Sequence, residues 1–331
     1  MGMRTIMGLV LVVTTVAIVA LVALYRMPPE LALEREARIA ATTGADALEA
    51  QIAAEEATVG AIREGLAKQI VWANPAERQK TAISVIYVHG FSASAAEVRP
   101  LPDLVAQGLG ANLFFTRLAG HGLNDPDALG LVTIEDWADD IGEALAVGKL
   151  LGDQVVVIST STGASLVTWA LGRPALADRV AASVFLSPNY GVQASGSFLL
   201  TGPFGSQIAR LLLGERRGFE PISPLNAHNW TTDYPVEALI PMAQSVRLAA
   251  HTPVEQIRIP ALFIQSADDK VVRPDRTAAL ASRWGGPHAV IDPGPTGDAN
   301  NHVIAGDTYS PQTTEPIART ILNWLGEQGI R

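Results

Sequence analysis

The chain has 331 residues, enough for one large domain or two modest ones. A hydrophobic content of 48% against 17% charged residues excludes a disordered chain, and a formal net charge of -9 without a long basic run argues against nucleic acid as a partner. Because the sequence contains no cysteine, structural disulfides, thiolate chemistry and cysteine-based metal sites are excluded.

An apolar stretch lies near the N-terminus and is flanked by arginines. Ile6–Tyr25 carries no charge and is about 20 residues long, which is what an α-helix needs to cross the hydrocarbon core of a bilayer. Two prolines follow and would end such a helix. We therefore predict that residues 1–28 form an uncleaved membrane anchor, with the rest of the chain on the extracytoplasmic side. A cleaved export signal is the alternative.

The next segment, residues 29–68, is rich in alanine with interspersed glutamate and arginine. Residues 47–62 have the pattern of a moderately amphipathic helix. We interpret 29–68 as a helical spacer that packs loosely between the anchor and the domain that follows.

A different pattern begins at residue 69. Two short runs rich in β-branched residues, Gln69–Trp72 and Ile83–Val88, predict strands. The second run ends in His89-Gly90-Phe91, and Ser94 with Glu97 then forms an S-x-x-E capping box that predicts the start of a helix. Sites in open α/β sheets gather at the carboxyl ends of central strands, where this loop is expected to lie.

Strands and helices alternate over most of the remaining chain. Strands are predicted at residues 112–117, 155–158, 180–186, 260–265 and 288–292, with helices between them and a last helix at 315–325. This alternation predicts an α/β fold with a mainly parallel central sheet and helices on both faces.

The alternation stops between residues 191 and 257. This stretch contains glycine, proline, aromatic and aliphatic residues without a strand–helix rhythm. A segment of this length inside a compact domain is usually a lid or cap rather than a bare loop. We predict an inserted cap at about 191–257. The sequence leaves open whether the cap touches a substrate or is a packed helical insertion.

The strand at 155–158 runs into a turn of small and hydroxylated residues with Ser161 at its apex. The pattern matches the nucleophile elbow G-x-S-x-G, in which small neighbours let a strained backbone expose the serine hydroxyl. Here the first position is Ser159 instead of glycine, and the last is Gly163. A plain βα connection or a phosphate cradle at a helix N-terminus would have a similar composition.

A nucleophilic serine needs a base, and the base needs a carboxylate that holds its tautomer. Histidine is the usual base because its pKa is near neutrality. After Ser161 the chain offers Asp268 and Asp269 behind one predicted strand and His302 behind the next. Because all three loops follow carboxyl ends of strands, a parallel sheet would bring them to one edge. The other five histidines fit neither the order nor the loop.

Residues 70–331 resemble the α/β-hydrolase superfamily, and more closely its bacterial branch of monoacylglycerol-lipase-like or S33 serine hydrolases. The resemblance rests on His89-Gly90-Phe91, Gly120-His121-Gly122, the elbow at Ser161, Asp268-Asp269-Lys270-Val271-Val272 and Asn301-His302. It implies an α/β-hydrolase fold over residues 69–331, with Asp269 as the triad acid and Asp268 as the alternative. The backbone N–H groups of Phe91 and Thr162 are implied as the oxyanion hole.

The implied activity is hydrolysis of a carboxylic ester through an acyl-enzyme, with no metal or organic cofactor. The expected partners are a small-molecule ester and, through the N-terminal helix, a membrane. The predicted anchor and the apolar cap favour lipophilic or acylglycerol-like substrates. An S33-type peptidase or amidase and a non-catalytic binding module on the same scaffold are the alternatives.

Overall fold

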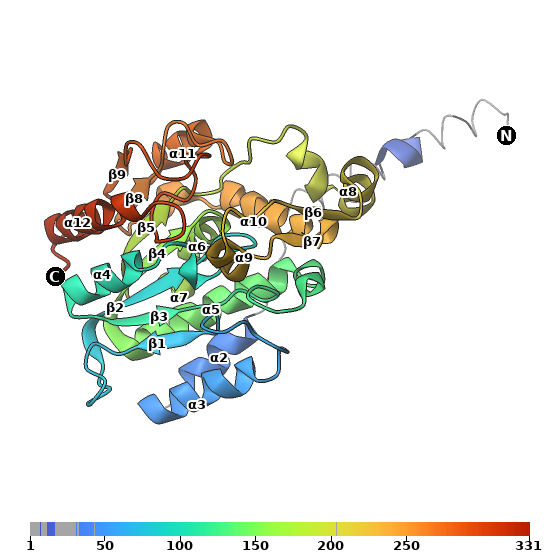
Figure 1. Ribbon diagram of the computed structural model, residues 1–331. Coiled ribbons are helices and arrows are strands. Elements are labelled where there is room, and N and C mark those ends of the chain that lie inside the picture. Colours follow the sequence, from blue (N-terminus) through green and yellow to red (C-terminus); the bar gives the residue numbers. More distant parts are fainter. Residues whose placement is uncertain (1–6, 8–11, 17–30, 32, 43, 203) are drawn as a thin grey trace.

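The computed structural model describes residues 7, 12–16, 31, 33–42, 44–202 and 204–331. Within these residues a seven-stranded sheet with the order β1-β3-β2-β4-β5-β8-β9 forms the centre of the molecule (Figure 1). β1 pairs antiparallel with β3, and the other neighbours pair in parallel. The strands are β1 Gln69–Val71, β2 Thr81–Val88, β3 Asn112–Phe115, β4 Gly152–Thr160, β5 Val180–Leu186, β8 Ala261–Ile264 and β9 His288–Ile291.

The central strands are buried on both faces. In β4 the run Val155–Ile158 is fully buried, as expected of β-branched residues in a parallel strand that is covered on both sides. Because successive side chains point to opposite faces, Val155 and Val157 join one hydrophobic cluster and the residues that alternate with them join another.

Helices complete both clusters and so cover both faces of the sheet. One cluster contains side chains of α5 Ile134–Leu151, α6 Thr162–Leu171 and α11 Pro274–Ala281, and the other contains side chains of α4 Leu101–Leu109 and α12 Pro311–Glu327. Shorter helical elements are α7 Pro174–Ala177, η1 Ala95–Glu97 and η2 Pro126–Gly130. The predicted fold class is confirmed.

A group of short elements lies between β5 and β8, and we call residues 191–257 the cap. It contains η3 Ser197–Thr201, α8 Gly205–Leu213, β6 Arg216–Gly218, α9 Pro224–Asn229, β7 Asp233–Pro235, η4 Val236–Ala238, α10 Leu239–His251 and η5 Val254–Gln256. β6 and β7 form a separate antiparallel pair, and α10 packs on α6. The cap is thereby attached next to the helix that follows the elbow (Figure 1).

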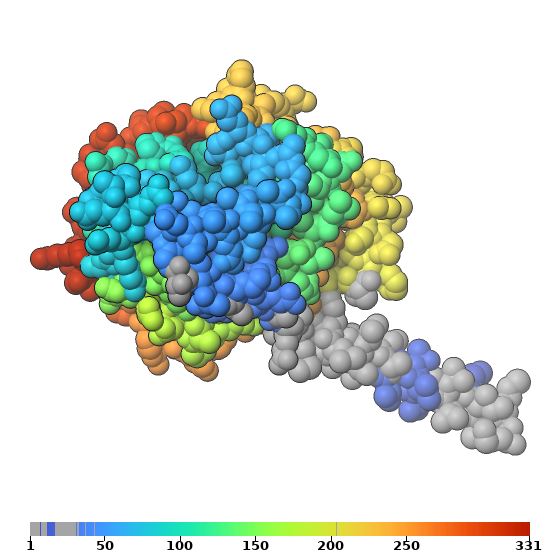
Figure 2. Space-filling view, turned by 90° about the horizontal axis from the view of Figure 1, so that it is seen from below, coloured from blue at the N-terminus to red at the C-terminus, as the bar shows by residue number. Residues whose placement is uncertain are grey.

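The helices before the sheet are integrated into the domain. α2 Glu34–Ala40 packs against α5, and α3 Ala45–Glu56 follows it. Ile39, Leu48 and Ile52 are buried in the same hydrophobic cluster as α5. Figure 2 shows the blue part of the chain, which includes α2 and α3, seated among cyan and green parts. In the described part of the segment interpreted as a loosely packed spacer, these apolar side chains are thus buried against the domain.

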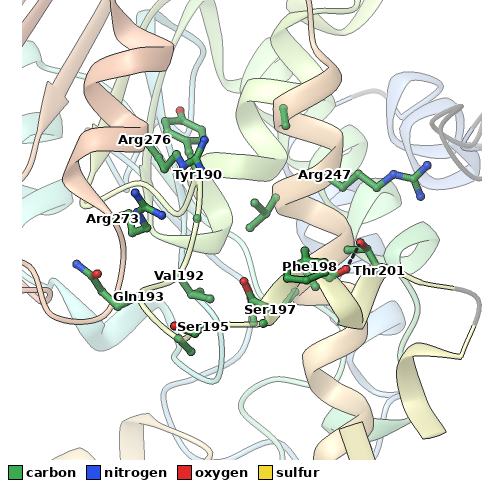
Figure 3. A pocket seen from close by; sticks show the side chains of 17 residues that line it. Tyr190, Val192, Gln193, Ser195, Ser197, Phe198, Thr201, Arg247, Arg273 and Arg276 are labelled. Atoms are coloured by element: carbon green, nitrogen blue, oxygen red, sulfur yellow. Dashed lines mark hydrogen bonds between the residues drawn. The ribbon is translucent and has the colours of Figure 1, made fainter. Parts of the chain in front are cut away.

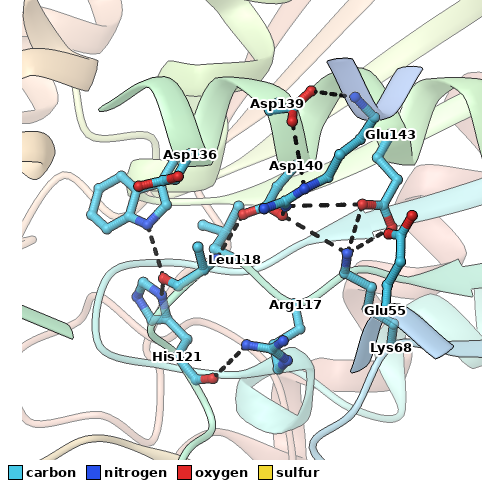
Figure 4. A network of polar contacts seen from close by, with 12 residues as sticks. Glu55, Lys68, Arg117, Leu118, His121, Asp136, Asp139, Asp140 and Glu143 are labelled. Atoms are coloured by element: carbon cyan, nitrogen blue, oxygen red, sulfur yellow. Dashed lines mark hydrogen bonds and ion pairs between the residues drawn. The ribbon is translucent and has the colours of Figure 1, made fainter. Parts of the chain in front are cut away.

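Ion pairs between buried side chains reinforce this attachment (Figure 4). Lys68 Nζ lies 2.6 Å from Glu143 Oε1, and these side chains are 4% and 0% exposed. Arg35 of α2 bonds Asp140, which lies in α5 together with Glu143. Such groups tolerate burial because each charge has a partner.

The predicted membrane location is contradicted. Among the described residues, no helix is both long and apolar enough to cross a bilayer, for which about 20 helical residues are needed. Of the predicted anchor, Met7 and residues 12–16 are helical, and the rest of residues 1–28 lies outside the described part. We retain neither the membrane anchor nor its extracytoplasmic orientation or membrane partner. The alternative of a cleaved signal falls on the same undescribed residues.

Candidate active site

Ser161 stands in the turn between β4 and α6 with φ 51° and ψ -115°. This conformation is strained for a residue other than glycine and costs of order 1–3 kcal/mol. The turn closes because position 163 has no side chain: a Cβ there would lie 2.5 Å from His89 O and 2.6 Å from Val88 O. Ser159, at the first position of the motif, is fully buried. The backbone has the sharp strand–turn–helix form that a nucleophile elbow requires.

His302 lies between Ser161 and Asp269. Its Nε2 is 3.1 Å from Ser161 Oγ, and its Nδ1 is 2.8 Å from Asp269 Oδ2. The carboxylate can only accept, so Nδ1 carries the proton and Nε2 is left to accept from the serine hydroxyl. These three side chains, 141 and 33 positions apart in the chain, meet at the carboxyl edge of the sheet.

Only one of the two candidate carboxylates reaches the imidazole. The side chain of Asp269 is 0% exposed, and its second oxygen, Oδ1, accepts from Val271 N at 2.8 Å and Val272 N at 2.9 Å. Asp268 is exposed, and its N–H bonds Ser266 Oγ. With both oxygens of its carboxylate bonded, Asp269 is held in one orientation against His302.

Asp298 holds the loop that carries His302, and sequence reasoning did not single it out. Its Oδ2 accepts from His302 N at 3.0 Å and Val303 N at 2.9 Å, while Oδ1 accepts from Asn300 N at 3.0 Å. The sequence feature that could have pointed to Asp298 is an aspartate in a loop of turn-forming residues, because aspartate side chains in such loops often bond the backbone.

The protonation of His302 is set by opposing effects. Burial is the largest effect and disfavours the imidazolium, but the hydrogen bond and charge of Asp269, with the charges of Glu97 and Asp298, together outweigh it. The pKa of His302 is consequently raised above its usual value. A general base must be able to accept a proton near neutral pH, and the raised pKa of His302 meets this requirement.

Two residues that line the cavity at Ser161 have backbone N–H groups without a partner in the described part of the chain. Within the described residues, Phe91 N–H and Thr162 N–H have no hydrogen-bond acceptor. Thr162 opens α6, and the first N–H groups of a helix lack partners inside the helix. Both residues line the cavity at Ser161. The two N–H groups are free to bind an oxygen atom there.

Two histidines hold the loops around these donors. His89 bonds Gly90 O through Nδ1 and accepts from Leu118 N, and His121 bonds Ala119 O and accepts from Ser92 N. Burial lowers the pKa of His89 to about 4 and that of His121 well below its usual value. Both rings are therefore neutral, and their hydrogen bonds to the backbone give them a structural role.

The remaining histidines, His228, His251 and His288, bond backbone carbonyl oxygens and do not line the cavity at Ser161.

The predicted capping box at Ser94 is only half formed. Ser94 Oγ accepts from Ala96 N and caps the short η1 helix, whereas α4 begins later, at Leu101. Glu97 does not reach back to Ser94. It accepts instead from Gly90 N, because the chain folds its carboxylate behind the loop that carries Phe91.

A cavity of about 560 Å³ opens at Ser161 and His302. Its walls are largely apolar, and the cap supplies many of them: Phe219, Ile222, Trp230, Tyr234, Leu239 and Met242. Phe91 packs edge-to-face on Tyr234, with ring centroids 5.1 Å apart, and so links the loop after β2 to the cap. The cap therefore borders the cavity at Ser161.

A second cavity of about 370 Å³ adjoins the first and shares Val192 and Met242 with it. Figure 3 shows Arg273 and Arg276 on one side of this space and Phe198 on the other. Arg273 pairs with Asp275 at its own helix end.

The sequence and the fold place this chain in a family. The chain belongs to the alpha/beta hydrolase family, whose model matches residues 85–319. The resemblance inferred from the motifs is thereby confirmed. No match was found among curated proteins.

Several solved structures have a similar fold. One of the metagenome-derived lipolytic enzymes LipS and LipT aligns with a TM-score of 0.62 and 19% identity, over 80% of this chain and 99% of the other. Monoglyceride lipase from Saccharomyces cerevisiae gives 0.57 and 12%, over 79% and 91%. Monoacylglycerol lipase from Paleococcus ferrophilus gives 0.55 and 15%, over 79% and 98%. At these identities the likeness concerns the fold.

Proposed function

We propose that this chain is a serine hydrolase that cleaves carboxylic esters through an acyl-enzyme. Ser161 is the nucleophile, His302 the base and Asp269 the acid, and the N–H groups of Phe91 and Thr162 form the oxyanion hole. The proposed catalytic unit is residues 69–331 with the cap at about 191–257, preceded by the helical segment 29–68.

The observation that carries the proposal is the unbroken chain of contacts from Asp269 through His302 to Ser161. The distances of 2.8 Å and 3.1 Å are those of hydrogen bonds, and the order along the chain is nucleophile, acid, base. A phosphate cradle or a plain connection at the elbow would need neither the histidine nor the buried carboxylate.

In the acylation step Ser161 Oγ bonds the ester carbonyl carbon while its proton passes to His302 Nε2. The carbonyl π electrons move onto oxygen, and the two free N–H groups stabilise the negative charge. Each such donor is worth about 10²–10³-fold in kcat. Collapse of the tetrahedral intermediate breaks the bond to the alcohol, which leaves with the proton from Nε2.

Deacylation repeats these steps with water. His302 takes a proton from water while the water oxygen bonds the acyl carbon. When the carboxylic acid product is released, His302 returns a proton to Ser161 Oγ. Asp269 stays ionised and stabilises the imidazolium in both halves.

The walls of the cavity support a lipophilic acyl or acylglycerol-like substrate. Aromatic and aliphatic side chains of the cap line the cavity that Ser161 also lines, and burial of each substrate methylene among them contributes about 0.8 kcal/mol. The similar folds of the lipolytic enzyme and the monoacylglycerol lipases are consistent with such a substrate.

The test is hydrolysis of p-nitrophenyl esters from acetate to palmitate by the full chain, beside Ser161→Ala. We expect hydrolysis by the wild type and a fall in kcat of about 10⁴-fold or more in the variant, since triad members act as a unit. A fluorophosphonate probe should label the wild type and not the variant. If wild type and variant are equally inactive on all esters and equally unlabelled, the proposal is wrong. Cleavage of amides alone would favour the peptidase alternative.

A further inference from the structure

Glu97 is a buried carboxylate beside the candidate triad that the proposed mechanism does not use. It is 3% exposed, and the helix-capping role suggested by its spacing from Ser94 is not the one it has. A buried carboxylate is costly unless its oxygens are bonded, so its partners indicate what it does.

One oxygen of Glu97 joins two parts of the site. Oε1 accepts from Gly90 N at 2.6 Å and from the Tyr87 hydroxyl at 2.7 Å. The Tyr87 oxygen also lies 2.8 Å from Thr160 Oγ1, which directly precedes the elbow serine. Tyr87 is fully buried. The carboxylate thereby connects the loop after β2 with the end of β4.

The contact is close to the nucleophile. A Cβ built on Gly90 would lie 3.2 Å from Glu97 Oε2 and 3.2 Å from Ser161 Cβ. Gly90 is thus held between the carboxylate and the serine, and its lack of a side chain permits this approach.

Three consecutive backbone N–H groups of this loop have different partners. Gly90 N–H is held by Glu97, and Ser92 N–H is held by His121 Nε2 at 3.0 Å. Phe91 N–H, between them, has no acceptor among the described residues. These two bonds restrain the His89–Gly90 and Phe91–Ser92 peptides. They lie on either side of the Gly90–Phe91 peptide that carries the Phe91 N–H, so this N–H keeps a fixed direction.

We propose that Glu97 is a positioning residue that, through Gly90 and Tyr87, aims the N–H of Phe91 at the oxyanion. This inference rests on the proposed function, since it needs an oxyanion to form at Ser161. The geometry assigns Glu97 the role of a hydrogen-bond acceptor rather than that of a charge.

A charge role would have a different signature. Burial raises the pKa of Glu97 to about 7, despite hydrogen bonds from Tyr87 and Gly90 that favour ionisation. A full negative charge here would stabilise the imidazolium of His302 but oppose the nearby oxyanion. An acceptor role requires only Oε1, which receives both hydrogen bonds.

Two substitutions therefore separate the roles. Glu97→Gln removes the charge but keeps one carbonyl oxygen at the same reach. Glu97→Asp keeps the charge but withdraws it from Gly90 N by one methylene. The readouts are kcat and KM on the preferred p-nitrophenyl ester and the rate of fluorophosphonate labelling, all on the full chain.

We expect Glu97→Asp to lower kcat and the labelling rate by about 10–10²-fold with little change in KM, because misplacement by about 1 Å has effects of this size. Glu97→Gln should stay within about threefold of the wild type, since it retains the acceptor. Glu143→Asp is the matched control. It shortens another fully buried carboxylate, away from the site, and should lower the melting temperature without slowing labelling.

Opposite results overturn the inference. If Glu97→Gln is labelled slowly while Glu97→Asp is labelled at the wild-type rate, the charge of Glu97 matters. If the two variants are labelled at equal rates, fast or slow, positioning by the acceptor is excluded. Should Glu97→Asp not fold, Tyr87→Phe decides: it removes one donor to Oε1 and should slow labelling, and an unchanged rate contradicts the inference. A wild type that is neither active nor labelled overturns the proposed function together with the inference, whereas an active wild type with unaffected variants overturns the inference alone.

Discussion

Arg63 donates a hydrogen bond to the carbonyl oxygen of Trp230 at 2.7 Å and so joins the segment before the sheet to the cap. The same guanidinium bonds His228 O at 2.5 Å and Thr231 Oγ1 at 3.2 Å. Trp230 lines the cavity at Ser161. One side chain from the segment that precedes β1 thus holds a wall of the candidate active site.

Loss of this contact should loosen the cap. We expect Arg63→Ala to lower the free energy of unfolding by about 1–3 kcal/mol, the range for loss of hydrogen bonds from a charged donor to partly buried acceptors. Amide hydrogen exchange around Trp230 should become faster than in the wild type. Arg38→Ala, which removes an exposed arginine from α2, is the control and should leave exchange in the cap unchanged. Equal exchange in the two variants would contradict the role of Arg63.

The two neighbouring carboxylates should differ sharply in their effect on activity. Asp269→Asn is expected to lower kcat by about 10⁴-fold, since an amide at this position favours the wrong tautomer of the base. Asp268→Asn should leave kcat close to that of the wild type, because Asp268 is exposed and does not contact His302. Ester hydrolysis by both variants is the measurement. A larger loss in Asp268→Asn would reassign the acid.

The pH dependence should report the raised pKa of His302. Burial acts against the imidazolium but is outweighed by Asp269 together with Glu97 and Asp298, so the pKa lies above the usual value of 6.5. The base must be neutral to accept the serine proton, and kcat/KM should therefore rise with pH through a pKa above 6.5. Removal of the carboxylate charge in Asp269→Asn should move the rising part of the pH profile of kcat/KM to lower pH. If the rise stays at the same pH, a group other than His302 titrates.

The same shift has a consequence for stability. Since the folded protein holds the His302 proton more tightly than the unfolded chain does, the stabilisation is fully present below the unfolded pKa of about 6.5 and is lost as pH rises through the folded pKa. In His302→Gln this part of the pH dependence of unfolding should disappear, as chemical denaturation at several pH values would reveal.

The buried ion pair in Figure 4 should be costly to break on one side. Burial raises the pKa of Glu143 to about 7, against the effect of Lys68. Lys68→Met leaves this carboxylate without its closest partner and is expected to destabilise the fold by about 3–5 kcal/mol. The double variant Lys68→Met, Glu143→Gln should regain part of the loss. Lys80→Met breaks an exposed pair with Asp153 and should not shift the denaturation midpoint.

The local features of the site could be predicted because they depend on neighbours in sequence. Alternating β-rich and helical stretches indicated the parallel sheet, and small residues around Ser161 indicated the strained turn. Parallel strands end at one edge, so the order of Ser161, an aspartate and His302 was enough to expect that they meet. The resemblance to a family added Asp269 as the expected acid.

Other features depend on contacts that no local pattern records. The spacing of Ser94 and Glu97 fits a helix cap, but burial turned the carboxylate toward Gly90 N and Tyr87. The alanine-rich segment before the sheet looked like a spacer, yet Leu48 and its neighbours are buried against α5. The hydropathy of residues 1–28 suggested a membrane span that the described helices do not contain.

The class of fold and the chemistry of the candidate nucleophile and base could be inferred before any contact was known, because periodicity, turn residues and chain order are visible in the sequence itself. Which aspartate touches His302, which cap residues line the cavity and what Glu97 binds became clear from the folded domain. Those outcomes depend on side-chain direction and burial between segments that are distant in the chain, and their free energies are set only when the whole domain is packed.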